Sequence, residues 1–245
     1  MKATDPWFSL RAGKVTTGLR LFQKNYDRQP TASHIMELGV ACLWVEQYER
    51  AWKLFRKAVE EYPHSMSSFY GMAGAAAWCL GNVAEAVGQW RNGLESSYAD
   101  TDGLGIHLPL LLLTASILRP GSFETQMALR ILRKKARDHR VQEWPGPIAL
   151  LALGEICKGQ LQNHCSAADD LQTQDREWLA TFYEAVLTYR VGESAILKRT
   201  MQSLADIASP PWANQEFFLV RMWSEEFFIA RHEAVNRGGG QMLRT

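Results

Sequence analysis

The sequence predicts an all-α protein assembled from antiparallel helical hairpins. Apolar residues recur at spacings of three and four, as in Ala51, Leu54, Phe55 and Ala58, which is the period of a helix with one buried face. Few stretches alternate with the period of two that strands require. Helix breakers return at short intervals, at Pro30, Pro63, Gly81, Pro120, Pro145, Gly192 and Pro210. These intervals leave room for helices of about 12 to 18 residues joined by short turns.

The periodic segments between these breakers define the predicted helices. In chain order they cover residues 5–24, 32–46, 48–61, 66–79, 82–95, 104–118, 122–139, 147–159, 174–191, 194–208 and 211–235. Because stacked helical arrays can exceed the usual domain size as one cooperative unit, we predict a single domain over residues 1–245. The glycine-rich segment 237–245 has no helical pattern, and we predict that it is disordered.

Composition excludes several classes of protein. The chain has 245 residues, of which 47% are hydrophobic and 22% charged, so it has enough apolar material for a sizeable core and is not a disordered chain. A formal net charge of +1 argues against a protein whose main task is to coat nucleic acid. Nine tryptophans are more than such a core requires. They indicate either packing between helices or a surface that holds a partner.

The cysteines indicate a reducing compartment. The four cysteines have no disulfide-like spacing, and Cys42, Cys79 and Cys157 lie in apolar stretches where a free thiol packs as a small hydrophobe. The first residues lack the apolar core of a secretory leader. The longest apolar run, Leu104–Leu118, is too short to span a bilayer. We therefore expect a soluble, cytoplasmic protein with no membrane span.

Residues 35–63 contain the most specific motif. It runs Ile35-x2-Leu38-Gly39-x2-Cys42, then Ala51-x3-Phe55-x2-Ala58, and closes with Pro63. This segment resembles the tetratricopeptide repeat, in which a pair of helices carries small residues, an aromatic residue and a closing proline at these spacings. The physical logic agrees with the resemblance. Gly39 and Ala51 are small where the two helices cross, Phe55 fills the space between them, and Pro63 ends the second helix.

The motif returns further along the chain in looser form. Thirty-five residues on, Gly74 and Gly81 precede Ala86-x3-Trp90. More degenerate copies are Ala128-x3-Leu132 after Gly121, Leu150-x2-Leu153-Gly154-x2-Cys157, and Ala185 with Gly192 before Leu197-x3-Met201. The resemblance implies about five helix pairs over residues 32–210, stacked as a right-handed superhelix, an α-α solenoid. Because such an array must bury its terminal faces, we predict that helices 5–24 and 211–235 cap its ends.

The resemblance also implies a binding face. In tetratricopeptide-like arrays the first helix of each pair lines the concave side. Carried over position by position, the predicted inner face comprises Met36, Glu37, Val40, Leu43, Trp44, Met72, Ala75, Trp78, Phe182, Tyr183, Val186 and Tyr189, with Cys79 beside them. Family members that clamp a terminal carboxylate use Lys, Asn and Arg, whereas these positions are mainly apolar and aromatic.

This composition favours an apolar helix or extended segment of another protein as the ligand. Trp44 and Trp78 are the expected anchors, because buried aromatic residues dominate the energetics of interfaces. Alternatively, the superhelix or its capping helices cover several of these side chains.

No enzyme signature is present in the chain. GxGxxG, GKS, GKT and HExxH are all absent, and we predict no catalytic residue, no cofactor and no metal. Cys157, His164 and Cys165 lack the paired spacing of a tetrahedral zinc site. Asp169 and Asp170 are adjacent and would point about 100° apart on a helix, so they fit a helix start or a solvated loop better than an acid–base pair. An enzyme or small-molecule site in the polar interruption 160–175 remains the alternative.

The run Arg130–Arg140 is strongly basic, with six Lys and Arg residues in RILRKKARDHR. On a helix, Leu129, Leu132 and Ala136 face inward and the cations lie on the outer arc. The outward cations are Arg130, Arg133, Lys134, Arg137 and Arg140. This arc is either a solvated helix face or a contact for an acidic protein partner. Nucleic acid is the least favoured partner, because interleaved aromatic residues for base stacking are missing.

Together these observations predict a non-enzymatic scaffold that binds a protein or peptide on its concave face. An adaptor, a chaperone and an inhibitor or immunity-type protein all fit this description. The aromatic C-terminal segment allows a further alternative, in which that segment is the interface of an oligomer.

Overall fold

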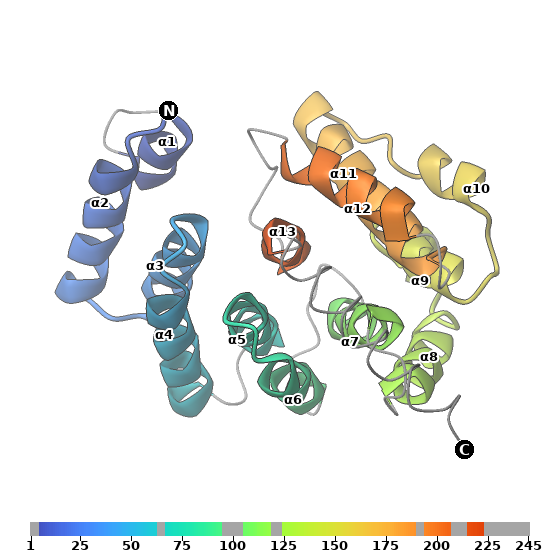
Figure 1. Ribbon diagram of the computed structural model, residues 1–245, viewed down its shortest axis with the longest axis horizontal. Coiled ribbons are helices and arrows are strands. Elements are labelled where there is room, and N and C mark those ends of the chain that lie inside the picture. Colours follow the sequence, from blue (N-terminus) through green and yellow to red (C-terminus); the bar gives the residue numbers. More distant parts are fainter. Residues whose placement is uncertain are drawn as a thin grey trace, which may run out of the picture.

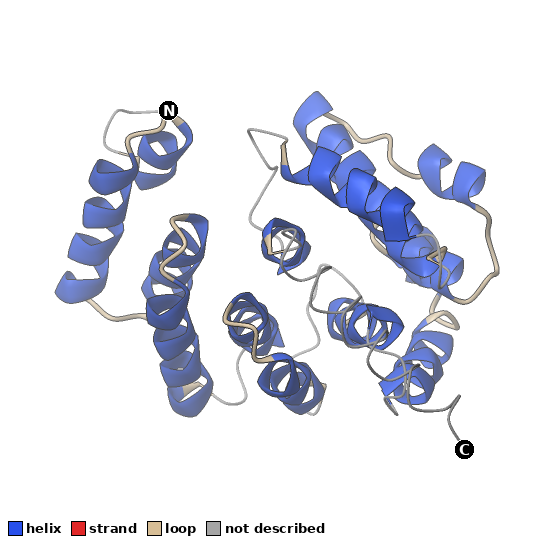
Figure 2. Ribbon diagram, in the orientation of Figure 1, coloured by secondary structure: helices blue, strands red, loops and turns tan. Residues whose placement is uncertain are grey.

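The computed structural model describes residues 5–62, 67–94, 105–118, 124–189, 194–206 and 215–222. Within these ranges the chain forms thirteen α-helices, one short 3-10 helix and no strand (Figure 2). The predicted all-α class is therefore confirmed. In the same ranges, no helix combines the length and the apolar character needed to cross a membrane.

Six helices form the N-terminal half, and each packs against the next in chain order (Figure 1). They are α1 (Pro6–Arg11), α2 (Val15–Arg28), α3 (Ala32–Trp44), α4 (Tyr48–Glu61), α5 (Ser67–Cys79) and α6 (Val83–Gly93). The sequence-based bounds of α3 to α6 agree with the structure to within two residues. Antiparallel hairpins of this kind are the unit that the periodicity and the breakers predict.

The turns inside the first three hairpins share one backbone geometry. Gly13, Glu46 and Gly81 lie 33 and 35 residues apart and have φ of 73°, 62° and 75°. In each turn, three successive N–H groups donate to the last carbonyls of the preceding helix in the same order. For example, the N–H of Asn82 donates to the carbonyl of Ala77 at 2.9 Å. A left-handed residue is the usual way to satisfy these carbonyls, and it favours glycine.

A small residue faces a large ring inside the second and third hairpins. A Cβ atom on Gly39 would lie 2.5 Å from the Phe55 ring, and one on Gly74 would lie 2.1 Å from Nε1 of Trp90. Phe55 and Trp90 are fully buried. The Trp90 indole also donates a hydrogen bond to the Gly71 carbonyl at 3.1 Å. The expectation that Gly39 is small because Phe55 fills the helix crossing is confirmed, and the same holds one repeat later.

The prediction of one capping helix over residues 5–24 is wrong, because α1 and α2 form a hairpin there. The chain turns at Gly13, whose left-handed φ closes α1. Gly18 and the buried Phe22 then follow the turn at the same distances as Ala51 and Phe55 follow Glu46. The N-terminal segment therefore repeats the second-helix pattern of the following hairpin, which the short α1 obscures in the sequence.

The C-terminal half is less regular. Its helices are α7 (His107–Leu118), α8 (Glu124–Lys135), the 3-10 helix η1 (His139–Gln142), α9 (Gly146–Ala152), α10 (Lys158–Asn163), α11 (Asp170–Leu187) and α12 (Ser194–Ala205). The pair α7–α8 packs together, as does α11–α12. In α8, Ala128 and Leu132 are fully buried, as their spacing predicts.

The predicted helix 147–159 is wrong, because two short helices replace it. Gly154 has a φ of 74° and closes α9, so it is a turn glycine like Gly81 and not a helix-crossing glycine like Gly39. Downstream of this turn, Cys157 is exposed, which contradicts its predicted burial, and Cys165 is buried instead. The apolar run that suggested a buried Cys157 ends with α9.

Two further helix ends differ from their predictions for local reasons. Helix α11 begins at Asp170 and not at residue 174, because an Asp169 carboxylate oxygen accepts the N–H of Gln172 at 2.8 Å and caps the helix. Asp169 thus lies at a helix start, as expected. The predicted helix 122–139 ends at Lys135, where three cations complement the helix dipole, and the chain continues into η1.

Helix α13 (Gln215–Arg221) lies near the centre of the molecule (Figure 1). It contacts α5 of the N-terminal half and α12 of the C-terminal half. Five of its seven residues are buried, namely Glu216, Phe217, Phe218, Leu219 and Val220. The predicted helix 211–235 therefore covers 215–221 within the described chain, whereas residues 223–235 and the predicted disordered tail 237–245 lie outside it.

Two Gly→Ala substitutions test the helix crossing in the third hairpin, because they should change the free energy of unfolding in opposite directions. Gly74→Ala would force a methyl group into the Trp90 ring and should lower the free energy of unfolding by about 1–3 kcal/mol. Gly88→Ala, in the interior of α6 with nothing near its Cβ, should raise it by about 0.5–1 kcal/mol. Urea unfolding of both variants measures the difference. Equal shifts in the same direction would contradict the close crossing.

Candidate functional site

The structure places eleven of the twelve residues of the predicted inner face on three helices. Helix α3 carries Met36, Glu37, Val40, Leu43 and Trp44, helix α5 carries Met72, Ala75 and Trp78, and helix α11 carries Phe182, Tyr183 and Val186, while Tyr189 follows the end of α11. Eight of these side chains are buried, and the four that are partly exposed are Met36, Glu37, Trp44 and Tyr189.

The two expected tryptophan anchors have different surroundings. Trp78 is 3% exposed, and its ring centroid lies 5.7 Å from that of Trp90, so it belongs to the core between α5 and α6. Trp44 is partly exposed and packs against α13. The structure therefore places only Trp44 of this pair at a contact with a separate helical segment.

Helix α13 lies against a defined set of residues, which we call the α13 seat. These residues come from α3, α5, α7 and α11, and Figure 1 shows α13 between these helices. The set comprises Trp44, Gly71, Cys79, His107, Trp178 and Tyr183. Gly71 belongs to it because a Cβ there would lie 2.6 Å from the Gln215 side chain. Trp44, Cys79 and Tyr183 were expected from the sequence.

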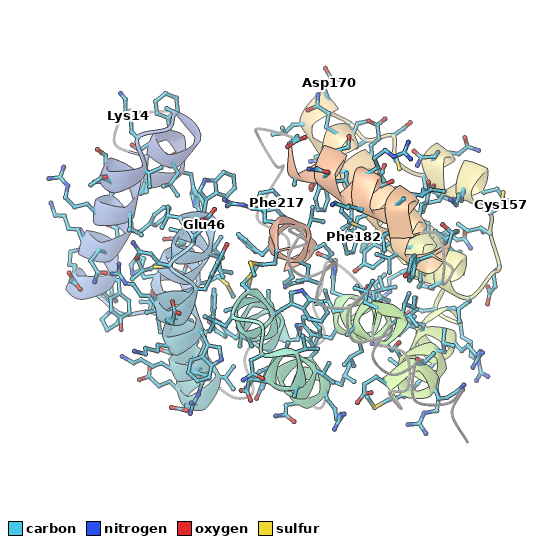
Figure 3. The ribbon with its side chains drawn as sticks, in the orientation of Figure 1. Lys14, Glu46, Cys157, Asp170, Phe182 and Phe217 are labelled. Carbon is cyan, nitrogen blue, oxygen red and sulfur yellow. The ribbon has the colours of Figure 1, made fainter. Side chains whose placement is uncertain are left out.

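Phe217 is the aromatic centre of the contact (Figure 3). Its ring stacks on Trp44 with centroids 5.6 Å apart and planes at 30°, and it meets Trp178 at 6.2 Å. Trp178 itself stacks on Phe182 at 6.1 Å. Phe217 thus joins α3 to α11, two helices from opposite halves of the chain, and aromatic pairs of this kind add to the stabilisation that burial supplies.

Phe218 packs on the α5 side of the seat. Its side chain is 1% exposed, and its carbonyl oxygen accepts a hydrogen bond from the Cys79 thiol at 3.6 Å. Burial raises the pKa of Cys79 to about 12, with a smaller opposing effect from Arg221. The thiol is therefore protonated at neutral pH and acts as a weak donor, not as a nucleophile.

A buried carboxylate lies beside these rings. Glu216 is fully buried, and one of its oxygens accepts a 2.5 Å hydrogen bond from the Tyr183 hydroxyl. Nδ1 of His107 lies 3.9 Å from the same oxygen. Burial alone would raise the pKa of Glu216, but the interactions with His107 and Tyr183 hold it below its usual value. Burial and this carboxylate raise the pKa of Tyr183 well above its usual value, so the hydroxyl remains a donor.

Arg221 fastens the other end of α13. One guanidinium nitrogen donates to the carbonyl of Trp44 at 2.8 Å, and the other pairs with Glu46. The guanidinium also lies 5.8 Å from the Phe217 ring centroid. Because the last carbonyls of a helix lack intrahelical partners, the end of α3 offers a natural acceptor for this arginine.

Sequence reasoning missed three members of the seat and most of its occupant. No motif singles out His107, and Gly71 lies within an apolar helix. Trp178 falls in the second turn of the predicted helix 174–191, whereas it lies in the middle of α11. In residues 211–235 the prediction recognised only a packed aromatic helix. A buried role for Glu216 could have been suspected, because it is an acidic residue directly before two phenylalanines.

The polar interruption 160–175 holds residues that cap and brace local structure. Thr173 accepts the N–H of Ala167 at 3.0 Å and donates to the carbonyl of Asp169 at 3.1 Å. Arg176 donates to the carbonyl of Ser166 at 2.9 Å. Within the described ranges, no three or more His, Cys, Asp or Glu side chains gather where they could hold a metal ion.

A separate shallow pocket of about 180 Å³ lies between α10, α11 and α12. Its lining residues are Lys158, Thr181, Glu184, Ala185, Thr188, Tyr189, Ile196, Leu197 and Thr200. The three threonine hydroxyls donate to carbonyls one turn back in their own helices, at 2.6 to 3.1 Å. Most of its polar groups are therefore engaged within the protein, and the pocket includes no residue of the interruption 160–175.

The predicted basic arc is exposed. Arg130, Arg133, Lys134, Arg137 and Arg140 are all exposed on α8 and the segment that follows it. Arg140 pairs with Asp138 at 2.7 Å and holds the pKa of that carboxyl well below its usual range. An acidic partner for this surface stays a prediction.

Comparison with protein-family models, with curated proteins and with solved structures gave no match for this chain.

The buried hydrogen bond at Glu216 can be tested by a substitution that removes one oxygen atom. Tyr183→Phe removes the donor to a buried carboxylate, and we expect it to lower the free energy of unfolding by about 1.5–3 kcal/mol. Tyr26→Phe is the matched control, because the Tyr26 hydroxyl accepts a hydrogen bond from the surface amine of Lys57 at 3.1 Å. Its effect should stay below about 0.5 kcal/mol. Equal losses in urea unfolding would show that Tyr183 does not hold the carboxylate.

Asp175 should make stability depend on pH. Burial, followed by repulsion from Glu216, raises its pKa to about 6, above the unfolded value of about 4. Protonation therefore favours the folded state, and this stabilisation is present below pH 4 and is lost as pH rises through 6. Because the side chain is only partly buried, we expect Asp175→Asn to gain about 1 kcal/mol over the native chain at pH 7.5 and little at pH 4.5. An equal gain at both pH values in urea unfolding would contradict this assignment.

Proposed function

We propose that the chain is a tetratricopeptide-like helical-repeat protein that binds a helical segment of another protein on its concave face and catalyses no reaction. The regular spacing of the turns at Gly13, Glu46 and Gly81 supports the repeat. The small-to-aromatic crossings of Gly39 with Phe55 and Gly74 with Trp90 support it further. Hairpins that share one turn and one crossing stack in the same way, which favours a solenoid.

The observation that carries the proposed function is the seating of α13. A seven-residue helix lies against residues that the repeat pattern assigns to the binding face, among them Trp44 and Tyr183. This is the helix-in-groove mode of recognition, in which an amphipathic or apolar helix inserts its anchors into a preformed surface. The chain's own helix therefore serves as an example of the ligand that this face accepts.

The contacts of α13 define the chemistry of such a ligand. An aromatic residue fits between Trp44 and Trp178, and a preceding carboxylate reaches Tyr183 and His107. A cation four residues after the aromatic residue meets the end of α3, as Arg221 does. The seat thus differs from the Lys, Asn and Arg clamp of carboxylate-binding relatives of this repeat class, since it holds a side-chain carboxylate with a tyrosine and a histidine.

The alternative is an enzyme or small-molecule site in the interruption 160–175. The polar contacts of Thr173 and Arg176 account for several of its side chains as supports for α11. This alternative requires a turnover that His164→Ala or Asp169→Ala abolishes without loss of folding. The proposal of an adaptor, chaperone or inhibitor requires only binding.

Site-specific photo-crosslinking in the full chain tests the proposed function. A photoreactive phenylalanine analogue replaces Trp44 in one variant and Trp52 in the control, where the tryptophan lies on α4 beneath Arg56. We expect the analogue at position 44 to capture a protein of the host. An excess of a synthetic peptide with the sequence of residues 215–222 should suppress that product and leave crosslinks at position 52 unchanged. Identical products at both positions, or no competition by the peptide, would contradict binding at the seat.

A further inference from the structure

The sequence of α13 occurs twice in the chain. Residues 215–221 read QEFFLVR, and residues 225–231 read EEFFIAR, ten positions later. Glutamate, both phenylalanines and arginine are identical in the two copies. The other three positions differ conservatively, with Gln, Leu and Val replaced by Glu, Ile and Ala. The first copy coincides with the bounds of α13, whereas the second lies outside the described residues.

The four identical positions make most of the specific contacts of α13 with its seat, whereas the three positions that differ are Gln215, which lies against Gly71, and the buried Leu219 and Val220. Glu216 reaches Tyr183 and His107, and Phe217 packs against Trp44 and Trp178. Phe218 is buried and accepts from the Cys79 thiol, and Arg221 binds the end of α3. A segment selected only to be apolar would not need the acid and the arginine at these places. The duplication therefore preserves a recognition pattern and not merely hydrophobicity.

Extension of α13 as one continuous helix does not account for the second copy. Ten residues along a helix advance it by about 15 Å and turn it by about 80° from the face of the first copy. The second set of side chains would then meet different neighbours, which have no reason to require the same residues. The same residues are explained when both copies fit the same seat, one at a time.

We propose that residues 225–231 are a second, weaker ligand of the α13 seat in the same chain. Residues 215–221 and residues 225–231 therefore occupy the α13 seat in turn. When residues 225–231 are bound, residues 215–221 are released from the seat. This inference rests on the proposed function, because it treats the seat as a surface that binds helices of one sequence pattern. That pattern is Glu-Phe-Phe-aliphatic-x-Arg, and a partner helix that displays it competes for the same seat.

The tether permits the second register at small cost. Eight residues separate α12 from Gln215 beyond Asp206, and eighteen would separate them from Glu225. By loop-closure entropy, a connection of eighteen residues closes only about threefold less often than one of eight. The loss of two buried methyl groups from Val220 to Ala230 disfavours the second copy by about a further tenfold. The first copy is therefore the preferred occupant, and a tethered segment has the advantage over a second chain, since its effective concentration is in the millimolar range.

A double-mutant cycle in the full chain tests the exchange. Phe227→Ala alone should change the folding equilibrium constant less than twofold, because the first copy fills the seat. In the Phe217→Ala background the second copy takes over the seat, so adding Phe227→Ala should lower that constant at least tenfold. The same small effect in both backgrounds would overturn the proposal.

A second double-mutant cycle uses the two arginines and leaves the aromatic contacts in place. Arg221→Ala and Arg231→Ala should show coupling of the same sign, since Arg221 lies at the partly exposed end of the seat. This cycle decides the matter if Phe217→Ala fails to fold. Sedimentation of each variant over a range of concentrations shows whether the segment that binds the seat belongs to the same chain. Coupling between the two substitutions in a monomeric protein supports exchange within one chain. Coupling that appears only when the protein forms a dimer overturns the proposal, because the segment then comes from a second chain.

These results are distinguishable from a failure of the proposed function. If the two cycles show no coupling while the crosslink at position 44 still yields to the 215–222 peptide, the seat binds partners but the second copy is not its ligand. If coupling is present and crosslinking yields no partner, the seat serves the chain's own two segments alone.

Discussion

The packing of Phe217 between Trp44 and Trp178 is the contact on which the arrangement of the helices depends. These tryptophans belong to α3 and α11, and α13 also contacts α5 and α12. A helix that is buried nearly all round contributes core on every side, so α13 joins two halves that otherwise meet mainly through neighbours in the chain. The carboxylate of Glu216 adds direction to this apolar contact, because a buried charge is tolerated only where its partners are correctly placed.

The first three hairpins share one regular turn geometry. Their turns close with a residue in the left-handed conformation. At two of their helix crossings a glycine packs against an aromatic ring, and a larger residue would clash with that ring. Glu46 takes the left-handed conformation where Gly13 and Gly81 stand, and its side chain pairs with Arg221. Glycine at this position would avoid the backbone strain, but the Glu46 side chain contacts α13 instead. The turn of the second hairpin is therefore joined to α13 by the ion pair of Glu46 with Arg221.

Predictions from the sequence succeeded where a local rule decides the structure. The bounds of α3 to α6 follow from apolar periodicity and from the turn residues, and the Gly39–Phe55 crossing follows from the repeat spacing. They failed where a helix was too short to recognise, and where a glycine formed a turn and did not lie at a helix crossing. The six-residue α1 is too short to show a period, and Gly154 is a turn residue in a frame that resembles a helix crossing. Neither distinction is visible in spacing alone.

The sequence by itself determined the helical class and the hairpins α3–α4 and α5–α6, and it singled out Trp44 and Tyr183 as candidate contact residues. Only the tertiary structure decided what covers them. The contacts of α13 with its seat join residues 33 to 177 positions apart in the chain, as in Tyr183 with Glu216 and Arg221 with Trp44. Such pairings depend on how hairpins stack and not on the period of any one helix. A side chain can therefore be assigned to an inner face from its own helix, whereas its partner across that face is decided by the whole array.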